Sequence, residues 1–147
     1  MYLPQKREEY PFLCAANNLF AAIAANTPPV LLLAHFSRTE LVVLDHTPIC
    51  SPHAYPATGL NAVRSYFDLL TTHWICQSIQ RHEMLARPEC RQVVAKASII
   101  WTWRHSGRSW KEDFTCTLNY DDQLRVKHFF VRTTSPPSTC VMMAVDP

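Results

Sequence analysis

The sequence predicts an α+β fold in which three N-terminal helices close a curved antiparallel sheet over a mostly apolar pocket. Two observations indicate this. Apolar residues recur at helical spacing in much of the first half of the chain, and the period changes to two after residue 73. The 147 residues are 48% hydrophobic and 18% charged, which is enough apolar material for the core of a single domain spanning 1–147.

Three helices are expected before residue 74. The segment 12–25 is rich in alanine and carries apolar residues at helical spacing. Thr27-Pro28 is a favourable start for a short second helix over 30–36, because Thr caps helices and proline suits the first turn. Gly59 precedes a third helix over 60–73, whose apolar stripe consists of Leu60, Val63, Phe67 and Leu70.

Five strands are expected. The first, 41–44, is short and β-branched, and the polar Asp45-His46-Thr47-Pro48 ends it and opens a loop that reaches residue 58. Short connections between the four longer strands predict an antiparallel meander, with strands at about 75–86, 91–104, 110–120 and 124–134. The core therefore spans about 12–134, and 135–147 is predicted to be a loosely attached tail.

Composition argues against several classes of protein. The formal charge is +2 without a basic run, so nucleic acid is not an expected partner. No apolar stretch is long enough to span a membrane and the N-terminus does not resemble a signal peptide, so we expect a soluble cytoplasmic protein. With only 2 glycines there is no phosphate-binding loop. The 6 cysteines are scattered and are predicted to be free thiols. No cofactor is expected, and no local motif indicates a metal site, so a metal would need three distant ligands that converge in the fold.

Strand alternation identifies two ionisable residues that break an apolar face. Glu112 shares a face with Phe114, and His128 shares one with Phe130 and Arg132. If these faces point inward, Glu112 and His128 lie on adjacent strands and can form a pair suited to proton transfer near neutral pH. The alternatives are a structural salt bridge or a solvent-exposed position near a strand end.

Further residues are candidates for binding a substrate. Trp101 and Trp103 place two indoles on the predicted inner face of their strand, where they either stack on an apolar ligand or belong to the ordinary core. Arg132 is either an anion ligand or an exposed strand-end residue. The remaining candidates lie in the third helix or on the strand faces named above, and they are Tyr66, His73, Phe114 and Phe130.

Three segments resemble the SnoaL-like group of the nuclear-transport-factor-two-like superfamily. They are Leu32-Leu-Ala-His-Phe-Ser, the strand ending Val43-Leu-Asp-His, and Ala57-Thr-Gly-Leu-Asn-Ala-Val-Arg-Ser-Tyr-Phe. The resemblance implies a cone-shaped domain with an internal pocket. The superfamily includes ketosteroid isomerases, scytalone dehydratase, polyketide cyclases and isomerases of fungal meroterpenoid pathways, and also members that only bind.

The resemblance implies a function and a further pair of candidates. In ketosteroid isomerases an acidic residue at the place of Asp45 moves the proton, but the spacing here differs by one residue, so His46 is the alternative inward residue. The residues that bind the oxyanion in that family are not recognisable here. The expected function is a cofactor-independent isomerase, cyclase or dehydratase of secondary metabolism, which acts by acid–base catalysis on an apolar polyketide- or terpenoid-derived carbonyl compound.

Two other functions remain open. One is a non-catalytic member of the same fold that binds a small molecule or a protein. The other is a hydrolase of an epoxide or ester, which would need a carboxylate-activated water because the chain has no serine nucleophile elbow. A homodimer is expected by analogy, with the outer sheet faces packed together and with apolar support from Ile100, Phe129 and Val131.

Overall fold

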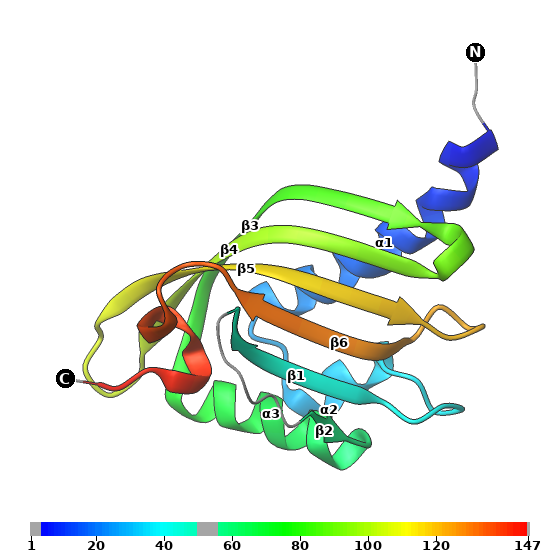
Figure 1. Cartoon of the computed structure of the whole chain (residues 1–147). Coiled ribbons are helices and arrows are strands. Elements are labelled where there is room, and N and C mark those ends of the chain that lie inside the picture. Colours follow the sequence, from blue (N-terminus) through cyan, green and yellow to red (C-terminus); the bar gives the residue numbers. More distant parts are fainter. Residues whose placement is uncertain (1–3, 50–55, 147) are drawn as a thin grey trace.

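The computed structural model describes residues 4–49 and 56–146 and confirms the predicted fold class. Three helices, α1 (Pro4–Ala24), α2 (Pro29–Leu32) and α3 (Leu60–His73), lie against one face of a curved six-stranded sheet (Figure 1). A 3₁₀ turn, Leu33–His35, extends α2. Within these residues, no helix combines the length and the apolar character that a bilayer span requires.

The helix bounds agree with the sequence, except at the N-terminus. The predicted first helix began after Pro11, since proline usually interrupts a helix, but α1 continues through Pro11 and begins at Pro4. The bounds of α3 match the prediction. Gly59 precedes it with a φ of 90°, a conformation that only glycine adopts without strain.

The sheet is mixed rather than purely antiparallel. The meander is confirmed for β3 (Trp74–Arg87), β4 (Gln92–Trp103), β5 (Ser109–Tyr120) and β6 (Val126–Thr133). However, β1 (Val43–Pro48) pairs with β6 in parallel, and the short β2 (Ala57–Thr58) pairs with β1 at the edge. The strand order is β2-β1-β6-β5-β4-β3. Part of the predicted 47–58 loop, residues 50–55, lies outside the described residues.

The position of β1 corrects one prediction that matters for the site. We expected the strand to end at Leu44, with the next four polar residues forming a turn. Instead, those residues form most of the strand, because β1 pairs with β6 as far as Pro48 opposite Thr133. Asp45 and His46 are therefore successive strand residues, and their side chains must lie on opposite faces of the sheet.

The inner faces of the strands follow the predicted alternation in β4 and β5 but not in β6. In β4, every second residue from Val93 to Trp101 is buried beneath the helices. In β6, the prediction is wrong, since Phe129, Val131 and Thr133 face inward and His128, Phe130 and Arg132 lie on the other face. The outer surface therefore lacks two of the apolar residues on which the predicted dimer rested.

The C-terminal residues are attached to the domain, contrary to the prediction of a loose tail. Two 3₁₀ turns, Pro137–Thr139 and Val141–Met143, follow β6 near its end (Figure 1). The Trp110 indole donates a hydrogen bond to the carbonyl of Thr139 over 2.8 Å, and Cys140 between the turns is fully buried. This segment thus forms part of the wall behind the site described below.

Candidate active site

Glu112 is the centre of a buried polar network on the inner face of β5. Its side chain is 0% exposed, although its strand neighbours on that face are apolar. Its Oε1 accepts a hydrogen bond from the Trp101 indole over 2.9 Å. Its Oε2 accepts one from the Thr133 hydroxyl over 2.7 Å and lies 2.7 Å from Nε2 of His46. A buried carboxylate is costly without such partners. Here they come from three strands, β4, β6 and β1.

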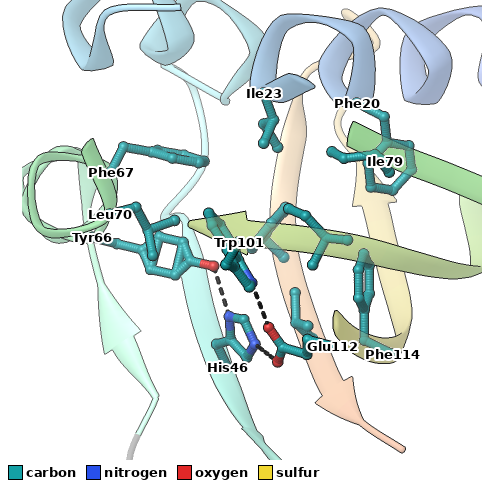
Figure 2. A pocket seen from close by; sticks show the side chains of 13 residues that line it. Phe20, Ile23, His46, Tyr66, Phe67, Leu70, Ile79, Trp101, Glu112 and Phe114 are labelled. Carbon is teal, nitrogen blue, oxygen red and sulfur yellow. Dashed lines mark hydrogen bonds and ion pairs between the residues drawn. The ribbon is translucent and has the colours of Figure 1, made fainter. Parts of the chain in front are cut away.

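His46 connects Glu112 to α3 (Figure 2). The imidazole comes from β1, opposite Val131 in β6, and both of its nitrogens have partners. Nε2 contacts Glu112, and Nδ1 lies 2.7 Å from the Tyr66 hydroxyl. Tyr66 is held in place by edge-on contacts with the rings of Phe67 and Phe129. The three side chains thus form a continuous chain of hydrogen bonds from strand to strand to helix.

The charges of this network are set by proximity rather than by burial. Burial by itself lowers the pKa of His46, but side-chain interactions with Cys140 and Glu112 outweigh it and raise that pKa to about 9. Burial pushes the pKa of Glu112 up, and the hydrogen bond and charge of His46 pull it below its ordinary value. Burial raises the pKa of Tyr66. At neutral pH the network therefore contains an imidazolium, a carboxylate and a neutral phenol.

A small cavity of about 30 Å³ borders this network. His46, Tyr66 and Glu112 form its polar side, and the rest of the wall is apolar or aromatic: Phe20, Ile23, Phe67, Leu70, Ile79, Ile99, Trp101, Phe114, Phe129 and Val131 (Figure 2). Such a space accommodates water-sized molecules, whereas drug-sized ligands occupy roughly 300–1,000 Å³. The arrangement is that of an acid–base group facing a small, mostly apolar cavity.

Cys140 lies behind the histidine. One potential ligand atom each of His46, Glu112 and Cys140 lies within 4.8 Å of the others, and all three residue types bind transition metals. However, both ring nitrogens of His46 are engaged by Tyr66 and Glu112, and two further donors hold the carboxylate. In the described structure, His46 and Glu112 therefore act as members of a hydrogen-bond network.

Several residues singled out from the sequence are brought together here. Glu112, His46, Tyr66, Trp101 and Phe114 all border the cavity. Of the two alternatives at the end of β1, His46 is the inward one. The roles of these residues are taken up below as a proposal.

Asp45 and Arg132 form a separate ion pair on the other face of the sheet. The Arg132 guanidinium lies 2.6 Å from the Asp45 carboxylate and also donates to the Thr47 hydroxyl over 2.8 Å. Neither Asp45 nor Arg132 borders the cavity, because strand alternation turns both away from it. The interpretation of Asp45 as an inward base is thus wrong for this chain.

His128 does not meet Glu112. The register of β5 and β6 places His128 opposite Asn119, roughly 24 Å along the strand from Glu112 at about 3.4 Å per residue. Its ring stacks on Phe130, with ring centroids 5.4 Å apart, and its Nδ1 bonds the Asn119 side chain over 2.9 Å. The predicted Glu112–His128 pair is therefore wrong, since the two side chains are on opposite faces.

Trp103 and His73 also lie away from the cavity. Trp103 packs among the indoles of Trp74 and Trp110, with centroid distances of 4.9 and 5.8 Å. His73 is exposed at the end of α3. These two positions were predicted to bind a substrate, and neither borders the cavity that His46 and Glu112 share.

Two members of the site were missed. Thr133 was assigned to the outer face of β6, although the more apolar alternation of Phe129, Val131 and Thr133 indicated the inner one. Cys140 was placed in a loose tail. No local pattern in the sequence signals its position, because it depends on how the C-terminal turns pack against the sheet.

By sequence, no protein-family model matches the chain and no curated protein is similar to it. By structure, it is similar to the epoxide hydrolase/cyclase-like enzyme SalBIII of salinomycin pyran ring formation, with 12% identity, coverage of 91% of this chain and 95% of that one, and a TM-score of 0.69. It is also similar to the BvnE pinacolase from Penicillium brevicompactum, with 13% identity, 92% and 89% coverage, and a TM-score of 0.69.

A further similar structure is a computationally designed 17-OHP binder, with 15% identity, coverage of 86% of this chain and 93% of the other, and a TM-score of 0.67. At these identities the likeness concerns the fold. It agrees with the helix-covered curved sheet and with the segments that resemble the SnoaL-like group. The chain shares its overall fold with these structures, as expected from the resemblance of its segments to the SnoaL-like group.

Proposed function

We propose that this chain is a cofactor-independent isomerase, cyclase or dehydratase that acts by acid–base catalysis on an apolar molecule bearing a carbonyl or epoxide oxygen. The observation that carries the proposal is the fully buried His46–Glu112 pair, 2.7 Å apart, at the wall of an otherwise apolar cavity. An ion pair in such a place is unfavourable for stability in comparison with apolar packing, and functional sites are where such pairs concentrate.

Tyr66 is the group that meets the substrate oxygen. Since the His46 imidazolium donates its Nδ1 proton to the Tyr66 oxygen, the phenol proton is free to be donated into the cavity. A substrate oxygen that gains negative charge accepts this proton, and the Nδ1 proton of His46 moves to Tyr66 in turn. The positive charge behind the phenol favours this transfer, and the low dielectric strengthens it.

Glu112 keeps the imidazolium charged and oriented and does not act as a free base. Its two oxygens already accept from Trp101, Thr133 and His46. After the first transfer His46 is neutral, and it can take up through Tyr66 the proton that the substrate releases elsewhere. The substrate gains one proton and loses one, so the pair returns to its initial state, which is what an isomerisation or cyclisation requires.

The size of the cavity constrains how a substrate enters. At about 30 Å³ it is too small for a molecule of several rings, so binding requires side chains of the wall to move. The two natural enzymes of the same fold, named as epoxide hydrolase/cyclase-like and as a pinacolase, support chemistry at an oxygen-bearing carbon. A polyketide- or terpenoid-derived substrate from secondary metabolism is part of the same proposal.

The test is a substrate panel followed by mass spectrometry. Polyketide- and terpenoid-type ketones and hydroxy-epoxides are incubated with the protein, and products are sought at unchanged mass or after loss of one water. We expect Tyr66→Phe and Glu112→Gln to lower turnover by about 100-fold or more. The matched control is Asp113→Asn, the next carboxylate along β5, which faces outward and bonds Ser98. Equal turnover in all variants would exclude this mechanism.

A non-catalytic binding protein is the second candidate. It is favoured because both oxygens of the Glu112 carboxylate already have hydrogen-bond partners within the protein. The designed 17-OHP binder, which has the same fold, also supports it. In that case ligands from the panel bind with measurable heat by calorimetry and are recovered unchanged. The same panel therefore separates the two candidates.

A further inference from the structure

A second cavity, of about 20 Å³, lies next to the first. Four side chains border both cavities, and they are Ile23, Phe67, Leu70 and Trp101. The remaining wall of the second cavity comes from the turn after α1, the end of α2, the end of α3 and the start of β3: Asn26, Thr27, Leu32, Thr71, Trp74 and Cys76. These four shared side chains therefore lie between the space beside His46 and the space beside Trp74.

Trp74, which lines this second cavity, carries an unused hydrogen-bond donor. The residue is 5% exposed, and its buried Nε1 has no hydrogen-bond partner within residues 4–49 and 56–146. Neighbouring polar groups are already bonded: the Asn26 amide pairs with the backbone of Cys76 over 2.9 Å in both directions, and the Thr71 hydroxyl donates to the carbonyl of Phe67. A buried N–H left without an acceptor costs roughly 1–3 kcal/mol, so it invites an acceptor from a ligand.

The wall between the cavities has fixed and adjustable parts. Trp101 is held by its hydrogen bond to Glu112, and Phe67 is held by ring contacts with Phe36 and Phe129. Leu70 and Ile23 have no such polar or aromatic restraint, and aliphatic side chains change rotamer readily. A change at Leu70 is therefore the simplest way to join the two cavities.

We propose that the two cavities join into one elongated ligand site, in which the Trp74 indole donates a hydrogen bond to a ligand oxygen at the end remote from His46 and Glu112. From Tyr66 to His73, the last residue before Trp74, α3 rises roughly 10.5 Å at about 1.5 Å per residue. The ligand class is thus an elongated apolar molecule with an oxygen acceptor near each end. This inference rests on the proposed function only in taking the same cavity as the ligand site.

The test compares two rigid probes of the same shape, 2,6-diacetylnaphthalene and 2,6-diethylnaphthalene. The ¹H–¹⁵N spectrum of ¹⁵N-labelled protein shows one indole signal per tryptophan, and the signal missing in Trp74→Phe identifies Trp74. We expect the diketone to shift the Trp74 N–H signal downfield, as hydrogen bonding does, and the hydrocarbon to leave it without this downfield shift. This measurement uses the wild-type chain, so a poorly folded variant does not compromise it.

Affinity gives a second readout. Trp74→Phe is expected to weaken binding of the diketone by about 5- to 10-fold and to change binding of the hydrocarbon by less than about 2-fold. Leu70→Ala is expected to strengthen binding of both probes. The proposal is overturned if neither probe binds up to its solubility limit, if the Trp74 signal is unmoved at saturation, or if both probes shift it alike. No turnover is measured, so its failure and that of the proposed function are separate results.

Discussion

Glu112 and Asp113 are neighbouring carboxylates on β5, and alternation sends them to opposite faces of the sheet. Glu112 is fully buried, with Trp101, Thr133 and His46 around it. The Asp113 side chain is 43% exposed, accepts from the Ser98 hydroxyl over 2.5 Å and lies 3.7 Å from the Lys111 ammonium. One residue step along the chain thus separates a buried acid–base network from an ordinary surface cluster.

The comparison shows what a carboxylate needs in order to become functional. Asp113 also has hydrogen-bond partners, but solvent screens its charge. Glu112 has a positively charged partner at neutral pH, no exposure to solvent and an apolar cavity beside it. The chemistry therefore comes from the environment of the residue and not from its type.

The largest expected effect is on the free energy of unfolding, when the carboxylates of Glu112 and Asp113 are removed one at a time. Glu112→Leu leaves the His46 imidazolium buried without a counterion, so we expect a loss of about 3–5 kcal/mol in the free energy of unfolding. Asp113→Leu should lose about 1 kcal/mol, since Ser98 keeps its hydrogen bond with His82. Urea denaturation of both variants measures the difference, and equal losses would remove the distinction between the two faces.

The pH dependence of stability follows from the same pair. The pKa of His46 is raised to about 9, so its contribution is full below its unfolded pKa of about 6.5 and is lost as the pH rises through 9. The pKa of Glu112 is lowered, so its contribution is present above about 4.5 and is lost as the pH falls through its folded value. Stability from the pair is therefore greatest between about pH 4.5 and 6.5.

This window can be checked by thermal melting across pH 3–10. Wild-type protein and Asp113→Asn should lose stability on both sides of the window. Glu112→Gln should flatten both arms, because neither titration is then coupled to a partner. Identical profiles for Asp113→Asn and Glu112→Gln would contradict the assignment.

An intermediate effect is expected at the two indoles of β4. Trp101→Phe removes the N–H donor to the Glu112 carboxylate and should lower the free energy of unfolding by about 1.5–3 kcal/mol. Trp103→Phe, two residues along the same face, keeps most of the ring packing and should lose less than about 1 kcal/mol. Denaturation curves measure both, and a larger loss at Trp103 would argue against the network as the sensitive part of this face.

The smallest effect is expected at the outer ion pair. The Arg132 side chain is 40% exposed and the Asp45 side chain 7%, so solvent weakens their attraction from the arginine end only. Arg132→Met should therefore lower the free energy of unfolding by about 1 kcal/mol and leave turnover of any substrate from the panel within about 2-fold of wild type. A strong loss of turnover, measured under the same conditions, would indicate that the reaction takes place on the outer face of the sheet.

The sequence predicted elements well where a single periodicity dominated. Helix α3, the four long strands and the inward position of Glu112 follow from local pattern. The position of β1 does not, since it depends on parallel pairing with β6, a contact between distant segments. The same pairing decides that His46 and not Asp45 faces Glu112.

The wrong face of β6 had a physical cause as well. A bulge between β5 and β6 near Tyr120 shifts the register, and Leu124 in the preceding turn has a positive φ. Val126 is buried as the alternation predicts, but the irregularity after it reverses the side chains from His128 onward. Cys140 lay beyond local prediction because its burial results from packing of the C-terminal turns.

The most direct test of the account is a ¹⁵N NMR titration of the His46 imidazole, assigned by comparison with His46→Gln. The account predicts that both ring nitrogens are protonated at pH 7, with a midpoint at about 9 that falls in Glu112→Gln and is unchanged in Asp113→Asn. A neutral imidazole at pH 7, or a midpoint near that of a free histidine, would contradict it.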